Sequence, residues 1–315
     1  MTAYFGLDIG SSSIKVTKSS LLGSKAFVVE SIGLSMNPAG SVDFADPIVA
    51  EKVGASIKQL LAENKIRERR VVMSVAESHV YSRILNMPTM SEAELSAAIK
   101  WEAEQFVPIP VTEVELDFSI LQQNKRGDSV KKMLVYLVAA PKVYLQKMVD
   151  CMTGIGLEPI AIESEMIAVT RALTFASEAS TSLILHMGAM SSVLAIVDES
   201  SLSFSYVTES GGVALTRALA QSLALPLPQA EEYKRTYGLT ETQVEGKVRT
   251  GLLIVLEGIV GEMRKAMEYH FTTRKTRVTR IVLSGGGAYL PELGSYLSQV
   301  FGGIEVIVGD VFASA

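Results

Sequence analysis

The sequence predicts an α/β protein in which two domains of one design lie on either side of a central cleft. Three observations favour this fold class. An apolar strand runs into a glycine turn of small residues near the start of the chain, and the same arrangement recurs in the second half. A third glycine turn follows a strand late in the chain. Such turns let a backbone approach a ligand closely.

The first turn has the residues needed to hold a nucleotide phosphate. The strand Phe5–Ile9 carries Asp8 near its end, and Gly10 follows. Three serines come next, small enough to let backbone N–H groups form an anion-binding nest. Asp8 is the candidate metal ligand, because a carboxylate beside phosphates can hold Mg²⁺ through its water shell. The motif is not a Walker A loop, and a plain polar hairpin turn is the alternative. The serines are Ser11, Ser12 and Ser13.

The second half repeats this pattern. The apolar run Leu183–Met187 leads to Gly188 and Ala189, and another strand, Val193–Val197, follows. One strand–turn–strand unit at the start of each half predicts a duplicated domain. The third turn follows the strand Arg280–Leu283 and precedes a helical stretch, a setting that favours negative charge. Its glycines are Gly285, Gly286 and Gly287.

Composition excludes several classes of protein. The chain has 315 residues, 48% of them hydrophobic, and a net charge of −5, which disfavours a general nucleic-acid binder. Its one cysteine, Cys151, excludes a disulfide framework and is expected to pack inside. The three histidines lack metal-ligand spacing. Residues 1–15 do not read as a signal peptide, and Gly251–Val260 is too short to span a bilayer. Any membrane link is expected to come through a partner.

Element patterns place an insert within the first domain. We expect that domain at 1–81 and 159–180, a compact β-α-β-β-α insert at 82–158, and the second domain at 181–315 with a helical part at about 212–275. The insert's first helix begins at a capping box, Ser91-x-x-Glu94. We expect its Trp101 to pack on the domain, and a polar loop at 124–129 to join the insert's last two strands.

One charged helix of the second domain has two interpretations. Glu231, Lys234 and Arg235 lie near one face of the expected helix Pro228–Tyr237. They could contact a ligand, but the pattern alone favours a surface helix whose charged side chains pair with one another.

Several segments carry a resemblance to known proteins. They are Phe5–Lys15, Asn86–Pro88 with Glu94–Leu95, Glu102–Pro108, Gly156–Pro159, Ala230–Lys234 and Ser284–Gly287 with Leu290–Pro291. Together they resemble the superfamily of actin, heat-shock chaperones and sugar kinases, and within it the PilM family of type IV pilus assembly, relatives of the division protein FtsA. The resemblance covers essentially the whole chain.

The resemblance implies ATP or ADP with Mg²⁺ in the cleft between the halves. It maps the first phosphate loop onto Asp8, Gly10, Ser11, Ser12, Ser13 and Lys15, and the second onto Gly188 and Ala189. It maps the adenosine side onto Gly285, Gly286 and Gly287, with Gly211, Gly212, Glu231 and Lys234.

The resemblance also implies partners. Proteins of this family hold the short cytoplasmic N-terminal tail of the membrane protein PilN, in a groove between the first domain and the insert. Contacts with other pilus assembly proteins, including the assembly ATPase, are implied too. The expected location is the cytoplasm, at the inner face of the cytoplasmic membrane.

Hydrolysis is left open by departures from the family pattern. Where the second loop of the family reads Asp-x-Gly, this chain has His186 before Gly188, and an imidazole cannot replace a magnesium-coordinating carboxylate. Tyr206 stands where family members often have arginine. The printed sequence ends at Ala315, where relatives continue, so a truncated or short form is expected.

The first hypothesis for the function is a nucleotide-binding scaffold that hydrolyses little ATP. Two other functions compete with it. An active ATPase or sugar kinase of the same fold needs a catalytic carboxylate, for which Glu163 and Glu165 are the candidates. An FtsA-like filament protein at the membrane needs a C-terminal amphipathic helix, and the printed sequence ends without one.

Overall fold

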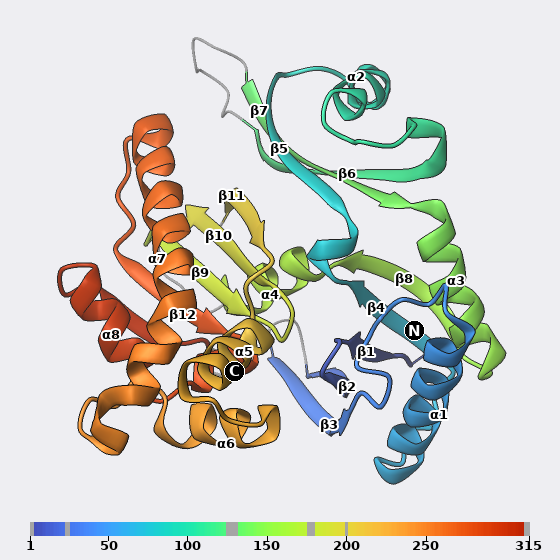
Figure 1. Ribbon diagram of the computed structural model, residues 1–315. Coiled ribbons are helices and arrows are strands. Elements are labelled where there is room, and N and C mark those ends of the chain that lie inside the picture. The colour runs from blue at the N-terminus through green and yellow to red at the C-terminus, as the bar shows by residue number, and fades with distance from the viewer. Residues whose placement is uncertain (1–2, 23–25, 124–131, 175–179, 199–200, 312–315) are drawn as a thin grey trace. The chain divides into compact units, whose positions relative to one another are not determined.

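The protein folds into two compact units. A computed structural model describes residues 3–22, 26–123, 132–174, 180–198 and 201–311. The first unit extends to Val169 and the second begins at Thr170, within helix α4 (Glu165–Thr174). Figure 1 shows one five-stranded sheet in each unit and a smaller sheet in the first. The loop expected at 124–129 and the chain end at Ala315 lie outside the described residues.

The first unit is built on a mixed sheet of strand order β3-β2-β1-β4-β8. Strands β1 to β3 form an antiparallel meander, and β4 and β8 add in parallel beside β1. Helices α1 (Pro47–Glu63) and α3 (Lys142–Gly154) pack on one face of this sheet (Figure 1). The strands are β1 (Phe5–Ile9), β2 (Ser13–Leu22), β3 (Ala26–Met36), β4 (Arg70–Val75) and β8 (Glu158–Ser164).

The apolar core of this sheet follows from strand alternation. Leu7 and Val16 are opposite each other across β1 and β2, and both are buried. Val53 and Ile57 of α1 meet them with 0% exposure, as apolar residues at helical spacing should. Cys151 of α3 packs against the same core, as predicted, and burial raises the pKa of its thiol.

The inserted segment forms a three-stranded antiparallel sheet covered by one helix. The strand order is β5-β7-β6, and Leu95 and Ile99 of α2 pack against this sheet. The predicted capping box is confirmed, because Ser91 and Glu94 satisfy each other's backbone N–H groups. The prediction for Trp101 is wrong: its side chain is 65% exposed, since it lies on the side of α2 away from the core. The elements are β5 (Tyr81–Pro88), α2 (Glu92–Glu104), β6 (Val114–Gln123) and β7 (Lys132–Pro141), with 3₁₀ turns η1 (Glu77–His79) and η2 (Val111–Glu113).

The second unit repeats the first sheet. Its order, β11-β10-β9-β12-β13, is again an antiparallel meander with two parallel strands beside the first strand. Helices α5, α7 and α8 contribute to its core, and the predicted duplication is confirmed at the level of strand order. The strands are β9 (Ser182–Met187), β10 (Ser192–Asp198), β11 (Ser201–Thr208), β12 (Arg280–Ser284) and β13 (Glu305–Val308). The helices are α5 (Gly212–Leu223), α6 (Leu227–Tyr237), α7 (Lys247–Arg274) and α8 (Leu293–Val300), with 3₁₀ turns η3 (Gln243–Gly246) and η4 (Gly286–Tyr289).

A search of the helices for a membrane span was negative. No helix within the described ranges combines the length and the apolar character that crossing a bilayer requires.

Candidate functional site

The first glycine turn joins β1 to β2. Asp8 and Lys15 are directly opposite in the strand register, and Lys15 Nζ lies 2.6 Å from Asp8 Oδ2. Both side chains are exposed to about half, 47% for the lysine and 40% for the aspartate. The Gly10 N–H donates to the Ser13 carbonyl at 2.9 Å and closes the turn, so Ser11 and Ser12 form its tip. The turn therefore presents a carboxylate, an ammonium group and small hydroxyl residues together.

A residue that the sequence analysis missed holds this turn in place. Asn37 is 7% exposed, and its side chain amide donates to the carbonyls of Gly10 and Ser41, each at 2.9 Å. Its own N–H donates to the Ser12 carbonyl. Asn37 follows the last residue of β3 and precedes Pro38, which is a signal for a local turn but not for a contact with a distant loop.

The second glycine turn joins β9 to β10 and has the same backbone closure. The Gly188 N–H donates to the Ser191 carbonyl at 2.9 Å. Its carbonyls are engaged by the start of α5, because the N–H groups of Gly212 and Val213 donate to Gly188 and Ala189. A Cβ on Gly211 would lie 2.6 Å from the Ala189 carbonyl oxygen, so this approach requires glycine.

The charged face of α6 packs against the start of α5, next to the second glycine turn. Lys234 Nζ donates to the Gly212 carbonyl at 2.9 Å, to Thr216 Oγ1 at 2.8 Å and to Glu231 Oε2 at 2.7 Å. Partial burial opposes ionisation of Glu231, but the hydrogen bonds from Lys234 and Thr216 outweigh it and lower the pKa of this carboxyl. The lysine side chain is only 11% exposed. The surface-helix interpretation of this pattern is therefore wrong for the Lys234 side chain, while Arg235 acts through its charge, which also lowers the pKa of Glu231.

The third glycine turn lies over the second one. Gly285 has φ +76°, and a Cβ there would lie 2.5 Å from the Met187 carbonyl oxygen. A Cβ on Gly287 would collide with the Met187 side chain, whereas Gly286 faces open space. The structure thus brings the candidate residues of the second unit into one cluster, made of the two turns, the start of α5 and one face of α6.

His186 occupies the end of β9, in the register position that Asp8 has in β1. Its Nδ1 lies 3.1 Å from Ser284 Oγ at the end of the neighbouring strand β12. The residue opposite His186 is Val193, where the first unit has Lys15. The second turn accordingly has neither the carboxylate nor the ammonium group of the first.

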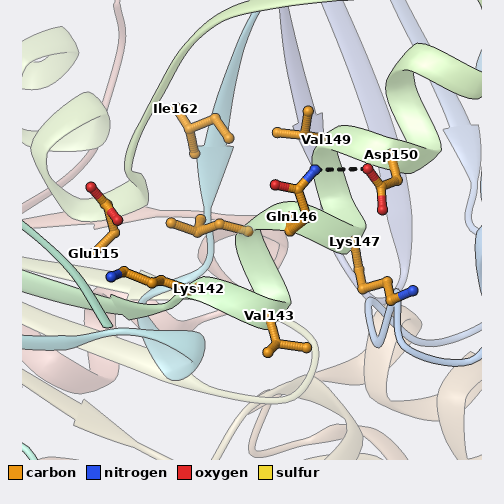
Figure 2. A pocket seen from close by; sticks show the side chains of 9 residues that line it. Glu115, Lys142, Val143, Gln146, Lys147, Val149, Asp150 and Ile162 are labelled. Atoms are coloured by element: carbon orange, nitrogen blue, oxygen red, sulfur yellow. Dashed lines mark hydrogen bonds between the residues drawn. The ribbon is translucent and has the colours of Figure 1, made fainter. Parts of the chain in front are cut away.

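A separate groove lies in the first unit, where the insert meets the five-stranded sheet. It has a volume of about 630 Å³ and runs along α3 (Figure 2). Glu115 and Lys142 lie at one end of it and Lys147 and Asp150 at the other. Its lining residues are Glu115 of β6, Ile162 of β8, and Lys142, Val143, Leu145, Gln146, Lys147, Val149 and Asp150 of α3.

Two sheets end at this groove. Among the described strands β6 pairs with β7, β8 pairs with β4, and each is the last strand of its sheet. Terminal strands keep backbone N–H and C=O groups that an added strand can use. The groove therefore combines an apolar floor, charges of both signs at its ends, and two strand edges.

The repeated sheet with its paired glycine turns defines the class to which this protein belongs, the actin-like fold. The family model of the type IV pilus assembly protein PilM matches residues 6–315. The chain belongs to this PilM family.

Solved structures agree with this assignment. A chain of a PilM–PilN type IV pilus biogenesis complex is 27% identical, with a TM-score of 0.85, and the match covers 100% of this chain and 90% of that one. MreB5 of Spiroplasma citri bound to ADP is 14% identical with a TM-score of 0.57, covering 100% and 94%. The ethanolamine utilization protein EutJ from Carboxydothermus hydrogenoformans is 15% identical with a TM-score of 0.55, covering 98% and 86%. The last two show the fold alone.

Proposed function

We propose that this protein is a nucleotide-binding scaffold of the type IV pilus assembly platform, and that its groove along α3 holds the cytoplasmic N-terminal segment of a PilN-like membrane protein. The observation that carries the proposal is a groove bounded by two terminal strands in a chain of the PilM family. In this view the protein works in the cytoplasm and reaches the membrane, and other assembly proteins including the assembly ATPase, through such contacts.

The nucleotide part of the proposal is supported by the cluster in the second unit and by the turn in the first. Gly188 and Ala189 would face phosphates, and Gly212, Glu231, Lys234 and Gly286 would face the adenosine. A relative of the same fold is described as bound to ADP. Within the described ranges, no group of three or more His, Cys, Asp or Glu side chains is arranged to hold a metal ion.

That donor set still fits Mg²⁺, because magnesium in phosphate sites usually keeps its waters and takes one or two carboxylates plus phosphate oxygens. Asp8 would be the carboxylate, and it would hold the ion through water. Lys15, which now pairs with Asp8, would be near enough to the turn to contact a phosphate. When bound, the ion would neutralise phosphate charge.

The partner part of the proposal is supported by the shape and chemistry of the groove. An extended segment can add to a sheet edge through main-chain hydrogen bonds, while pockets select alternate side chains. The apolar floor, to which Leu145 and Ile162 contribute, suits aliphatic side chains of such a segment. Charges of both signs at the ends of the groove would orient it.

The test is a matched pair of substitutions in the full chain. Val143→Asp places a charge at the second position of α3, where the native side chain is 68% exposed and lines the groove. Ile48→Asp places the same charge at the second position of α1, where the native side chain is 61% exposed and lies outside the groove. An acidic residue suits the first turn of either helix, so both variants should fold.

The probe is a synthetic peptide of the N-terminal cytoplasmic residues of the PilN-like protein from the same organism, with affinity measured by calorimetry. We expect Val143→Asp to weaken binding by about tenfold or more, as burying a charge in an apolar contact does, and Ile48→Asp to leave it unchanged. Equal binding by both variants would place the partner elsewhere.

A further inference from the structure

A buried carboxylate lies where the insert joins the first sheet, and neither the nucleotide site nor the groove lining uses it. Glu77 follows β4 in the turn η1, and its side chain is 2% exposed. A carboxylate in such a place needs hydrogen bonds or a counter-ion, because burial of an uncompensated charge is costly.

Three hydroxyl groups supply those hydrogen bonds. Ser82 Oγ donates to Glu77 Oε1 at 2.5 Å, Tyr136 Oη donates to the same oxygen at 3.0 Å, and Ser164 Oγ donates to Oε2 at 2.6 Å. The Tyr136 Oη and Ser164 Oγ atoms also lie 3.0 Å apart. Lysine, arginine and histidine side chains of the described residues form no ion pair with Glu77, so its charge is held by hydroxyl dipoles.

The donors come from three different strands. Ser82 is in β5 and Tyr136 is in β7, both in the insert sheet, while Ser164 ends β8 of the five-stranded sheet. Burial, and then the adjacent Glu77 carboxylate, raise the pKa of Tyr136, so the phenol remains a neutral donor. One carboxylate thus links the two sheets of the first unit.

The same junction supports the groove. Val75, Val80 and Ala140 form a small apolar cluster there, and Leu145 and Ile162 pack against it. Those last two side chains also line the groove. β7 runs directly from Tyr136 into α3, the wall of the groove, and Ile162 lies two residues before Ser164 in β8.

We propose that Glu77 is the positioning residue of the groove: its carboxylate gathers hydroxyls from β5, β7 and β8, holds the insert on the first sheet, and so sets the spacing between α3 and β8. The effect on peptide binding rests on the function proposed above. Glu77 touches no partner in this view and acts through the two groove walls.

The test compares three variants of the full chain. Tyr136→Phe removes one donor and keeps the ring, and Glu77→Gln brings N–H donors to a place where hydroxyls already donate. Tyr81→Phe is the control, because Tyr81 lies in the same sheet and its hydroxyl has no partner among the described residues. The variants are followed by hydrogen exchange, by thermal unfolding, and by association and dissociation of the PilN-like N-terminal peptide.

We expect faster exchange in β5 and α3 for Tyr136→Phe and Glu77→Gln, with the second unit unchanged. Peptide binding should weaken by about tenfold through faster dissociation, because loss of an internal hydrogen bond to a charged group loosens the two groove walls, which the peptide must then re-order. Tyr81→Phe should match the native chain. If Glu77→Gln does not fold, Tyr136→Phe decides.

Two results would count against different claims. Exchange in β5 and α3 that is unchanged in Tyr136→Phe, or a peptide affinity that is unchanged while the exchange rises, would overturn the role of Glu77. A native chain that fails to bind the peptide would overturn the proposed partner, and hydrogen exchange alone would then judge whether Glu77 holds the insert.

Discussion

The two glycine turns of this protein have the same backbone closure but carry different functional side chains. In each, a glycine N–H donates to the carbonyl three residues later, at 2.9 Å in both units, and a Cβ on the glycine would crowd that carbonyl. The side chains differ. The first turn places Asp8 opposite Lys15, and the second places His186 opposite Val193.

This difference shows which parts of a site follow from the fold and which from single residues. The closure of each turn depends on strand register and on glycine, and both are kept in the two units. The ion-pairing groups depend on two side chains, and the second unit has lost both. In the proposed function the first turn therefore handles the metal ion and the second contributes backbone contacts.

Removal of the Asp8 carboxylate is the strongest way to break this comparison. We expect Asp8→Ala to weaken Mg·ATP binding by about tenfold to a hundredfold, because interactions of this kind with a charged group contribute about 1.5–3 kcal/mol. The fold should survive, since the Asp8–Lys15 pair is exposed and such pairs add little stability. Calorimetry with Mg·ATP, and with ATP in a chelator, measures the effect.

The chelator arm is the internal control for this variant. ATP without metal should bind Asp8→Ala at least as tightly as the native chain, because the carboxylate then only repels the phosphates and pairs with Lys15. An unchanged Mg·ATP affinity would contradict the assignment of Asp8, whatever the second turn does.

Restoration of a carboxylate in the second turn would sharpen the comparison. His186→Asp gives the second turn the acid that the first one has, and we expect ATP turnover to rise above that of the native chain. Loss of one preorganised electrostatic group typically costs about 10²–10³ in rate, which bounds the gain. Phosphate release from single turnovers measures it.

The control for this experiment is Ser284→Ala, which removes one hydrogen-bond partner of His186 and adds no carboxylate. A gain in Ser284→Ala equal to that in His186→Asp would mean that loss of this contact matters and the carboxylate does not. Rapid turnover by the native chain, lost on substitution of Glu163 and Glu165, would instead favour the enzyme alternative.

Local patterns made the turns and most elements predictable. Gly10, Gly188 and the capping box at Ser91 depend on neighbours within a few residues, and such signals can be seen in a single sequence. The duplication could be predicted for the same reason, since each half starts with a strand and a glycine turn.

Contacts between distant segments were beyond this reasoning. Asn37, just after β3, donates to the Gly10 carbonyl in the turn between β1 and β2. The pattern around Lys234 favoured a surface lysine, because its carbonyl and hydroxyl partners come from a different helix, α5. Trp101 was expected to pack on the domain, but helix phase decides which side of α2 meets the sheet. The groove along α3 needs strands from both sheets, and no local motif marks it.

The smallest expected effect is on the pH dependence of stability, and it concerns one histidine in each unit. His270 is 1% exposed, and burial lowers its pKa, although Asp198 at 3.8 Å opposes the shift. His79 in the first unit is only partly buried, and burial lowers its pKa as well, against Asp43. In both cases the unfolded chain takes up the proton first as pH falls below the ordinary value of about 6.5.

Stability of the second unit should therefore be retained above about pH 6.5 and fall as the pH drops from there toward the folded pKa of His270, by at most about 1.4 kcal/mol per pH unit for one proton. His270→Gln should flatten this slope between pH 7.5 and 5.5, even though the loss of contacts with Ser203 and Thr276 lowers stability at every pH. His79→Gln should change the slope for the first unit less, because that ring is less buried. Hydrogen exchange in α7 and α3, followed across this pH range, separates the two units. A slope in α7 that is the same with and without the imidazole would show that His270 does not titrate between the folded and unfolded states.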